Sequence, residues 1–166
     1  NVPAYDEMTP ESFLKFVCES RGIMGRNRRD AIDRMGETCA IANVMHQPIG
    51  TLSKGYRRRV GLAQALVHDP PVLIFDEPTV GLDVLNAIEM QNIVRELRNE
   101  GKAIVFSTHI MSEAEKLCDR IGIIHHGRLH ALGTLEHLRA ETGCRYLEDI
   151  FVHYVERAGS APLAGG

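Results

Sequence analysis

The sequence predicts an α/β protein with a mainly parallel sheet, preceded by an amino-terminal helical subdomain. Three observations predict this class. Residues 1–70 carry apolar side chains at helical spacing and no strand-like run. Short apolar runs then alternate with helical patterns from residue 72 to residue 132, as they do in strand–helix–strand units. With 166 residues and 44% hydrophobic side chains, the chain is also long enough to bury a core of its own.

Three helices are predicted within residues 1–70. Thr9 precedes Pro10, which indicates an N-cap followed by proline at the first helical position. A second helix has its apolar face on residues 32–42. Ser53 opens a third helix, which ends before a pair of prolines. We therefore assign residues 1–70 to a helical subdomain.

Residues 71–145 are predicted to form half of an α/β core. Val72 to Phe75 is a short continuous apolar run, as expected for a parallel strand that is covered on both faces. The other predicted elements are a helix over residues 84–99, a strand over 103–107, a helix opened by a capping box at 112–115, strands over 121–124 and 128–132 around a turn at Gly127, and a helix capped by Thr134. Residues 146–166 hold a last helix and a loose tail.

Composition argues against several classes of protein. The 19 basic and 22 acidic residues give a net charge of −3, so no overall basic field favours nucleic acid as a partner. No apolar run approaches the ~20 residues that span a bilayer. The four cysteines are far apart and lack a C-x-x-C pair, which is typical of reduced thiols in a cytosolic protein.

The residues that could carry chemistry gather where the predicted strands end. Asp76 and Glu77 follow the first strand, and His109 follows the second. Ligands of open parallel sheets bind at these carboxyl ends, so one acid can hold a hydrated Mg²⁺ while the other orients or deprotonates a water. A pair of acids alone is more often the cap of a following turn. Here a proline, a glycine, a third acid at Asp83 and the strand-end histidine also follow, which favours a phosphate site.

A second motif lies at the start of the third helix. Ser53, Lys54 and Gly55 place a hydroxyl and a small residue where free N–H groups and the helix dipole favour an anion. Taken alone, this stretch is better interpreted as an ordinary serine N-cap.

These motifs together resemble the ATP-binding subunit of ABC transporters. LSKGY resembles the LSGGQ signature as it occurs in the ABC-2-type exporter branch, VLIFDE resembles Walker B, and PTVGLD resembles the D-loop region. His109 falls on the switch histidine of that family. The resemblance covers nearly the whole chain. It implies a P-loop NTPase core of the RecA-like type, with ATP and Mg²⁺ as cofactors.

The resemblance also implies roles for the residues at the strand ends. Asp76 would hold Mg²⁺ through water, and Glu77 would be the catalytic base for the attacking water. His109 would contact the γ-phosphate, and Asp83 would cross the dimer interface.

For the signature motif, the resemblance implies contact with an ATP that is held mainly by the partner subunit. The residues that would bind it are Leu52, Ser53, Lys54 and Gly55. Ser53 and Gly55 would clasp the γ-phosphate. Lys54 and Tyr56 stand where the signature usually has glycine and glutamine. Both are variants of the exporter branch, so we interpret them as a subtype and not as a loss of activity.

One expected motif lies nowhere in the 166 residues, namely the phosphate loop G-x-x-x-x-G-K-[ST]. The stretch NVPAYDEMT resembles the segment just after the Q-loop in the family, and the first residue is Asn1 instead of methionine. We therefore expect a truncated chain with an incomplete core. The complete parent would be an ATP hydrolase, and this chain alone would be inactive.

The family resemblance implies partners and a location as well. The expected partners are a second nucleotide-binding subunit, in a homodimer or heterodimer, and a transmembrane permease, but no nucleic acid. The expected location is cytoplasmic, peripheral on the inner face of the cell membrane. Two alternatives are a non-catalytic remnant and a soluble ABC ATPase of translation or DNA repair, whose tandem cassettes or long coiled coils would not fit within this length.

Two further clusters have simpler interpretations. Arg57, Arg58 and Arg59 follow the signature, and we interpret them as a solvated helix face because no interleaved aromatic residues favour nucleic acid. A trio of histidines, His125, His126 and His130, surrounds the predicted hairpin. Their spacing fits no standard metal-ligand pattern, so ordinary surface histidines are the favoured interpretation.

Overall fold

The computed structural model describes residues 6–160, with side chains described to residue 157. These residues form two compact units, which divide between Ser107 and Thr108. The first unit contains α1–α4, β1 and β2, and the second contains α5–α7, β3 and β4. The subdomain bounds expected from the sequence, at residues 70 and 145, stay a prediction. From residue 161 on, the predicted tail lies outside the described residues.

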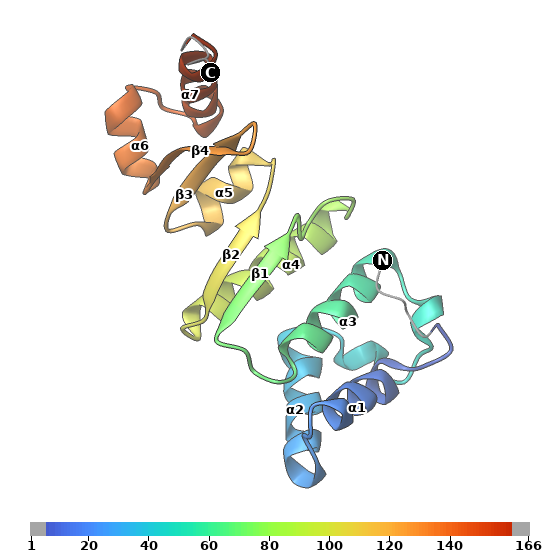
Figure 1. The fold of residues 1–166 in the computed structure, drawn as a ribbon. Coiled ribbons are helices and arrows are strands. Elements are labelled where there is room, and N and C mark those ends of the chain that lie inside the picture. Colours follow the sequence, from blue (N-terminus) through green and yellow to red (C-terminus); the bar gives the residue numbers. More distant parts are fainter. Residues whose placement is uncertain (1–5, 161–166) are drawn as a thin grey trace, which may run out of the picture. The chain divides into compact units, whose positions relative to one another are not determined.

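Three helices build the amino-terminal part of the first unit (Figure 1). They are α1 (Pro10–Ser20), α2 (Gly25–Thr38) and α3 (Lys54–Leu66), joined by the short 3₁₀ turns η1 (Ala42–Val44) and η2 (Ile49–Thr51). Two predicted N-caps are confirmed: Thr9 Oγ1 accepts the Ser12 N–H at 3.2 Å, and Ser53 Oγ accepts the Tyr56 N–H at 3.3 Å. Each satisfies a backbone donor that the helix itself leaves unpaired.

The second helix is shorter than its apolar spacing predicts. Helix α2 ends at Thr38, whereas the predicted face continued to Ala42. Ala40 takes a positive φ of 50°, which an α-helix cannot contain, and Ala42 starts η1 instead. Beyond the helix, Cys39 and Ile41 are buried all the same, whereas Ala42 is exposed. The apolar spacing therefore did not show where the helix ends.

Apolar side chains from all three helices form one core with β1 and α4 (Val84–Asn99). Its members include Phe13, Leu14, Ile32, Met35, Val60, Leu66, Leu73, Met90, Ile93 and Leu97. Fully burying one such side chain contributes about 1.5–3 kcal/mol. This shared core fixes the amino-terminal turn of α3 relative to the end of β1, where the candidate site lies.

Strands β1 (Val72–Asp76) and β2 (Ala103–Ser107) pair in parallel, with α4 as the connection between them (Figure 1). The register sets Asp76 opposite Ser107. Leu73 packs into the core with α4, but on the other face Ile74 is 79% exposed and Val105 is 62% exposed. The prediction of a strand covered on both faces is therefore wrong for the described residues. An apolar run indicates a face that is suited to burial and does not show which segment covers it.

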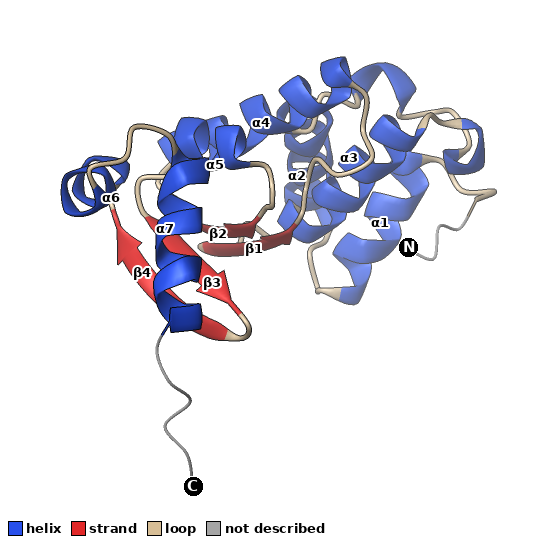
Figure 2. Cartoon of the chain, turned by 90° about the horizontal axis from the view of Figure 1, so that it is seen from above, coloured by secondary structure: helices blue, strands red, loops and turns tan. Residues whose placement is uncertain are grey.

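The second unit is built around an antiparallel hairpin. Its elements are α5 (Met111–Leu117), β3 (Ile121–His125), β4 (Arg128–Gly133), α6 (Leu135–Thr142) and α7 (Leu147–Ser160). His126 and Gly127 form the two-residue turn with φ of 47° and 72°, the combination that a tight hairpin needs. Figure 2 shows α7 over this hairpin, where Leu147 and Ile150 join the core that contains Ile123.

The capping box predicted for α5 is wrong. The helix begins at Met111 after Ile110, which makes no side-chain cap, and Ser112 lies within the first turn. The side chain that makes hydrogen bonds at this end of the helix is Thr108 instead. Its hydroxyl accepts the Ile110 N–H at 3.0 Å and donates to Glu113 Oε2 at 3.0 Å.

Within residues 6–160 the strands form two separate two-stranded sheets, one parallel and one antiparallel. The parallel pair confirms the predicted strand–helix–strand unit. Every helix of these residues falls short of the length or the apolar character needed to span a bilayer.

Candidate functional site

The two acids at the end of β1 are joined by a single side chain from β2. Ser107 Oγ donates to Asp76 Oδ1 at 2.6 Å and accepts the Glu77 N–H at 3.2 Å. The Glu77 N–H also lies 3.1 Å from the Ser107 carbonyl. Because the carboxyl ends of paired parallel strands meet at one edge, the hydroxyl of β2 reaches both acids of β1. The sequence located Ser107 at this edge but gave it no role.

Glu77 has an unusual backbone conformation. Its φ is 45°, in the left-handed region, which typically costs a residue with a Cβ about 1–3 kcal/mol. Hydrogen bonds on both sides hold it there: Ser107 binds its N–H, and the Arg58 guanidinium donates to its carbonyl. Arg58 also donates to the Val80 carbonyl at 3.1 Å. The helix that starts with the signature motif thus fixes the main chain of the proposed base.

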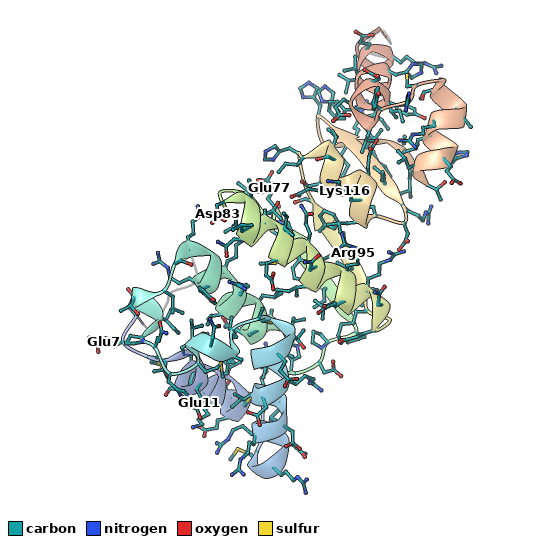
Figure 3. The ribbon with its side chains drawn as sticks, turned by 180° about the vertical axis from the view of Figure 1, so that it is seen from behind. Glu7, Glu11, Glu77, Asp83, Arg95 and Lys116 are labelled. Atoms are coloured by element: carbon teal, nitrogen blue, oxygen red, sulfur yellow. The ribbon has the colours of Figure 1, made fainter. Side chains whose placement is uncertain are left out.

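Asp83 caps the helix that follows the acids. Its carboxylate accepts the N–H groups of Leu85 and Asn86, each at 3.1 Å, and the Asn86 side-chain amide at 2.6 Å. These bonds, that from the Asn86 side chain first among them, hold the pKa of Asp83 below its usual range. Asp83 is therefore an exposed carboxylate in a fixed orientation. Figure 3 shows it with Glu77 near the N-terminal end of α4, with Arg95 farther along the helix.

The start of the signature helix packs against this same segment. A Cβ added to Gly55 would lie 2.1 Å from Asn86 Oδ1, and one added to Gly81 would lie 2.5 Å from Lys54 Nζ. Gly81 has a φ of 73°, which favours glycine independently. Glycine at these two positions permits a close approach between α3 and the segment after β1. The start of α3 therefore lies beside the segment after β1, with Gly55 against Asn86 and Lys54 against Gly81.

The arginine cluster after the signature is not a solvated face. Arg58 binds the carbonyls of Glu77 and Val80, and Arg59 is only 7% exposed. Arg59 lies over the Tyr56 ring at 4.2 Å and donates to the Ala40 carbonyl at 3.1 Å. Only Arg57 of the three is exposed. The sequence-based interpretation is therefore wrong for two of the three residues, because helical spacing alone does not reveal which neighbours lie within reach.

His109 belongs to the second unit, two residues after Ser107 in the chain. It is exposed, and the residues on either side of it are tied together by the Thr108 hydroxyl. Thr108 donates to Glu113, a carboxylate that is only 4% exposed. Glu113 had no predicted role apart from its place in the capping box. The only signal in the sequence was an acid four residues after the strand-end histidine.

The three histidines of the hairpin lie close together in the second unit. The His125 ring is 4.0 Å from that of His126 and 6.2 Å from that of His130. His130 Nε2 is 3.2 Å from the His125 carbonyl oxygen. In the described part of the chain, no group of three or more His, Cys, Asp or Glu side chains is arranged to hold a metal ion.

Comparison with known proteins identifies the family. A family model described as "ABC transporter" matches residues 4–80. The ABC transporter ATP-binding protein NatA of Bacillus subtilis is 34% identical over 153 residues, which is 92% of this chain and 62% of NatA. This chain belongs to the ABC transporter ATP-binding proteins. The chain is also 38% identical over 152 residues to the Nod factor export ATP-binding protein I of Burkholderia orbicola. This match covers 89% of the chain and 50% of that relative.

Solved structures agree with this family assignment. The structure of cbiO1 from Clostridium perfringens, described as part of the ABC transporter complex cbiONQ, superposes with a TM-score of 0.74 at 28% identity. The superposition covers 81% of this ABC chain and 54% of cbiO1. The predicted P-loop NTPase class is therefore confirmed. The ABC chain spans about half to three-fifths of the length of these relatives.

Proposed function

We propose that this ABC ATP-binding protein is the ATP-hydrolysing motor of an export system that works across a membrane. The observation that supports this most strongly is the arrangement within the first unit. Two acids are tied to one serine at the end of a parallel pair, and the signature helix packs against the segment that follows them. An ordinary turn cap would explain neither the left-handed backbone of Glu77 nor the Arg58 bonds that hold it.

Glu77 is the proposed general base. A carboxylate that accepts a proton from the attacking water must keep its position while the nucleotide binds. The hydrogen bonds with Ser107 and Arg58 keep Glu77 in position because they fix both sides of its main chain. A water placed by the Glu77 carboxylate would attack the terminal phosphate, and the proton would pass to that carboxylate.

Asp76 fits the requirements of a magnesium site. Mg²⁺ in nucleotide sites typically takes one or two carboxylates and completes its shell with waters and phosphate oxygens. Asp76 is exposed at the strand end, and the Ser107 hydroxyl orients one of its oxygens. Asp76 would hold the ion through water. When bound, Mg²⁺ neutralises charge on the phosphates.

The remaining motif residues are proposed to contact nucleotide across a dimer. Leu52, Ser53, Lys54 and Gly55 would meet an ATP held by a second ATP-binding subunit, with Ser53 and Gly55 at its γ-phosphate. The exposed N-terminus of α3 suits this role because Ser53 supplies a hydroxyl and the helix supplies its positive dipole end. Asp83 would reach the same interface, and His109 would contact a γ-phosphate.

A permease of the exporter type is the proposed membrane partner. The names of two relatives support this: one is an export ATP-binding protein, and cbiO1 is described as part of a transporter complex. The proposed contact is a cleft of about 780 Å³ between α1 and α2, whose lining includes Lys15, Arg28, Arg29 and Glu37. Its mixture of charges suits a short polar segment of the permease. The proposed location is therefore the inner face of the cell membrane.

Removing the metal tests the proposed ATPase. We expect the full-length protein, purified with its permease, to release inorganic phosphate from ATP in Mg²⁺ and to lose this activity when EDTA removes the ion. The reason is that Asp76 can act on the phosphates only through a cation. Protein that is returned to excess Mg²⁺ is the control. Hydrolysis that continues unchanged without divalent cations would rule out the role of Asp76.

The 166 residues taken alone should bind ATP weakly and show no Mg²⁺-dependent turnover. They contain the acids and the signature but not the loop whose backbone N–H groups surround the phosphates. Titration with a fluorescent ATP analogue measures this, with the full-length protein as comparison. Micromolar affinity in the 166 residues would show that the described motifs hold nucleotide without such a loop.

A further inference from the structure

A chain of hydrogen bonds connects the signature helix with the cap of α4, and none of the proposed catalytic and nucleotide-binding roles uses it. Asn86 Nδ2 donates to Asp83 Oδ2 at 2.6 Å, and Arg59 Nη2 donates to Asn86 Oδ1 at 3.4 Å. The other end of the same guanidinium donates to the Ala40 carbonyl at 3.1 Å. Three segments that are distant in sequence thus meet at one arginine and one asparagine.

The burial of the Arg59 guanidinium in this position is energetically unfavourable. It is 7% exposed, and its Nε is buried without a hydrogen-bond partner among the described residues. Burying a guanidinium is unfavourable unless polar groups replace the water it loses. The lost water is replaced only in part, by the Ala40 carbonyl, the Tyr56 ring and the Asn86 amide oxygen. A residue that served packing alone would not need the charge.

Asn86 has the chemistry required between its two neighbours. A side-chain amide donates with its nitrogen and accepts with its oxygen, so it can bind the Asp83 carboxylate and the Arg59 guanidinium together. Aspartate at this position would repel Asp83, and an apolar residue would remove one side-chain hydrogen bond from each neighbour.

The asparagine also touches the signature motif directly. A Cβ on Gly55 would lie 2.1 Å from Asn86 Oδ1, so the amide fills the space that this glycine leaves open. One side chain therefore contacts both parts of the molecule that are proposed to meet the partner's nucleotide: the backbone of Gly55 and the carboxylate of Asp83.

We propose that Arg59 and Asn86 are positioning residues, which hold the signature turn and Asp83 of one subunit in a single arrangement so that both meet the partner subunit's nucleotide together. Neither residue needs to touch ATP for this. The proposal rests on the proposed ATPase function.

The test is Asn86→Ala in the full-length protein. We expect kcat for ATP to fall by about tenfold or more, because small displacements of contacting groups can cost up to 10²-fold, while KM for ATP stays within about twofold. The matched control is Asn92→Ala on the same helix. Asn92 is exposed, and its side chain accepts a hydrogen bond from Arg95 on the same helix, away from the signature motif, so kcat should not change.

A second variant separates positioning from stability. Arg59→Lys keeps the charge but loses the planar group that donates at two ends, so it should lower kcat as Asn86→Ala does. The double variant should be no slower than the slower single variant, since both break one chain of bonds. Independent, multiplying losses of kcat, or a kcat that recovers when each variant is cooled well below its unfolding temperature, would indicate a structural role only.

The Glu77→Gln variant distinguishes failure of the positioning proposal from failure of the proposed ATPase function. Wild-type kcat in Asn86→Ala, beside an inactive Glu77→Gln, would overturn the positioning proposal and leave the ATPase in place. Normal turnover in Glu77→Gln would overturn the proposed function, and the positioning proposal with it.

Discussion

Glu77→Gln should abolish ATP hydrolysis by the full-length protein and leave nucleotide binding intact. Glutamine has nearly the shape of glutamate but cannot accept the proton from the attacking water. Loss of a general base typically costs 10²–10⁴-fold, so we expect kcat to fall by at least about 10²-fold. The main-chain bonds to Ser107 and Arg58 do not involve the side chain and should survive the change. Steady-state phosphate release and equilibrium ATP titration measure the two effects separately.

The matched control for this variant is Glu96→Gln on α4. Glu96 is exposed and lies within the helix, away from its N-terminal end, and the substitution makes the same chemical change. Its kcat should equal that of the wild type. Near-normal turnover in Glu77→Gln would remove Glu77 from the role of base, whatever the control shows.

Gly55→Ala should destabilise the protein and lower its ATPase activity. The new Cβ would lie 2.1 Å from Asn86 Oδ1 and 2.3 Å from its Cγ. The amide cannot move aside without losing its bonds to Asp83 and Arg59. Overpacking of this kind costs about 1–3 kcal/mol, which exceeds the gain of up to about 1 kcal/mol from replacing glycine by alanine in a helix. Denaturant unfolding measures the net change in the free energy of unfolding.

Two further variants make the Gly55 prediction specific. In Gly55→Ala with Asn86→Ala, the colliding atoms are gone, so the double variant should be more stable than Gly55→Ala alone. Gly36→Ala in α2 is the opposite case, since its Cβ would meet Ala42 atoms at ordinary distances of 3.7 and 3.8 Å. That variant should be as stable as the wild type or more so. Wild-type stability of Gly55→Ala would contradict the packing described between α3 and α4.

Features that depend on neighbours in sequence could be predicted. The N-caps at Thr9 and Ser53, the turn at Gly127 and the bounds of α4 follow from local backbone chemistry, which is readable from one chain. The edge where β1 and β2 end follows from a general rule about parallel strands. The capping box at α5 was wrong because the helix begins at Met111, which places Ser112 inside the first turn and not before it.

Features that depend on contacts between distant segments could not be predicted. Arg58 reaches the Glu77 carbonyl and Arg59 reaches Asn86 because the helical core sets α3 beside α4, and no spacing within the arginine cluster shows this. The same holds for Ser107, whose role depends on register. The left-handed backbone of Glu77 has no marker in sequence, because the usual marker is glycine.

The most direct test of the proposed motor is a structure of the full-length Glu77→Gln protein with Mg²⁺ and ATP. We predict a dimer in which Ser53 and Gly55 of one subunit lie within hydrogen-bonding distance of the γ-phosphate of an ATP held by the other. Asp76 of that other subunit should face the metal through water. Nucleotide bound away from the end of β1, or a signature turn that faces away from it, would contradict the proposed motor.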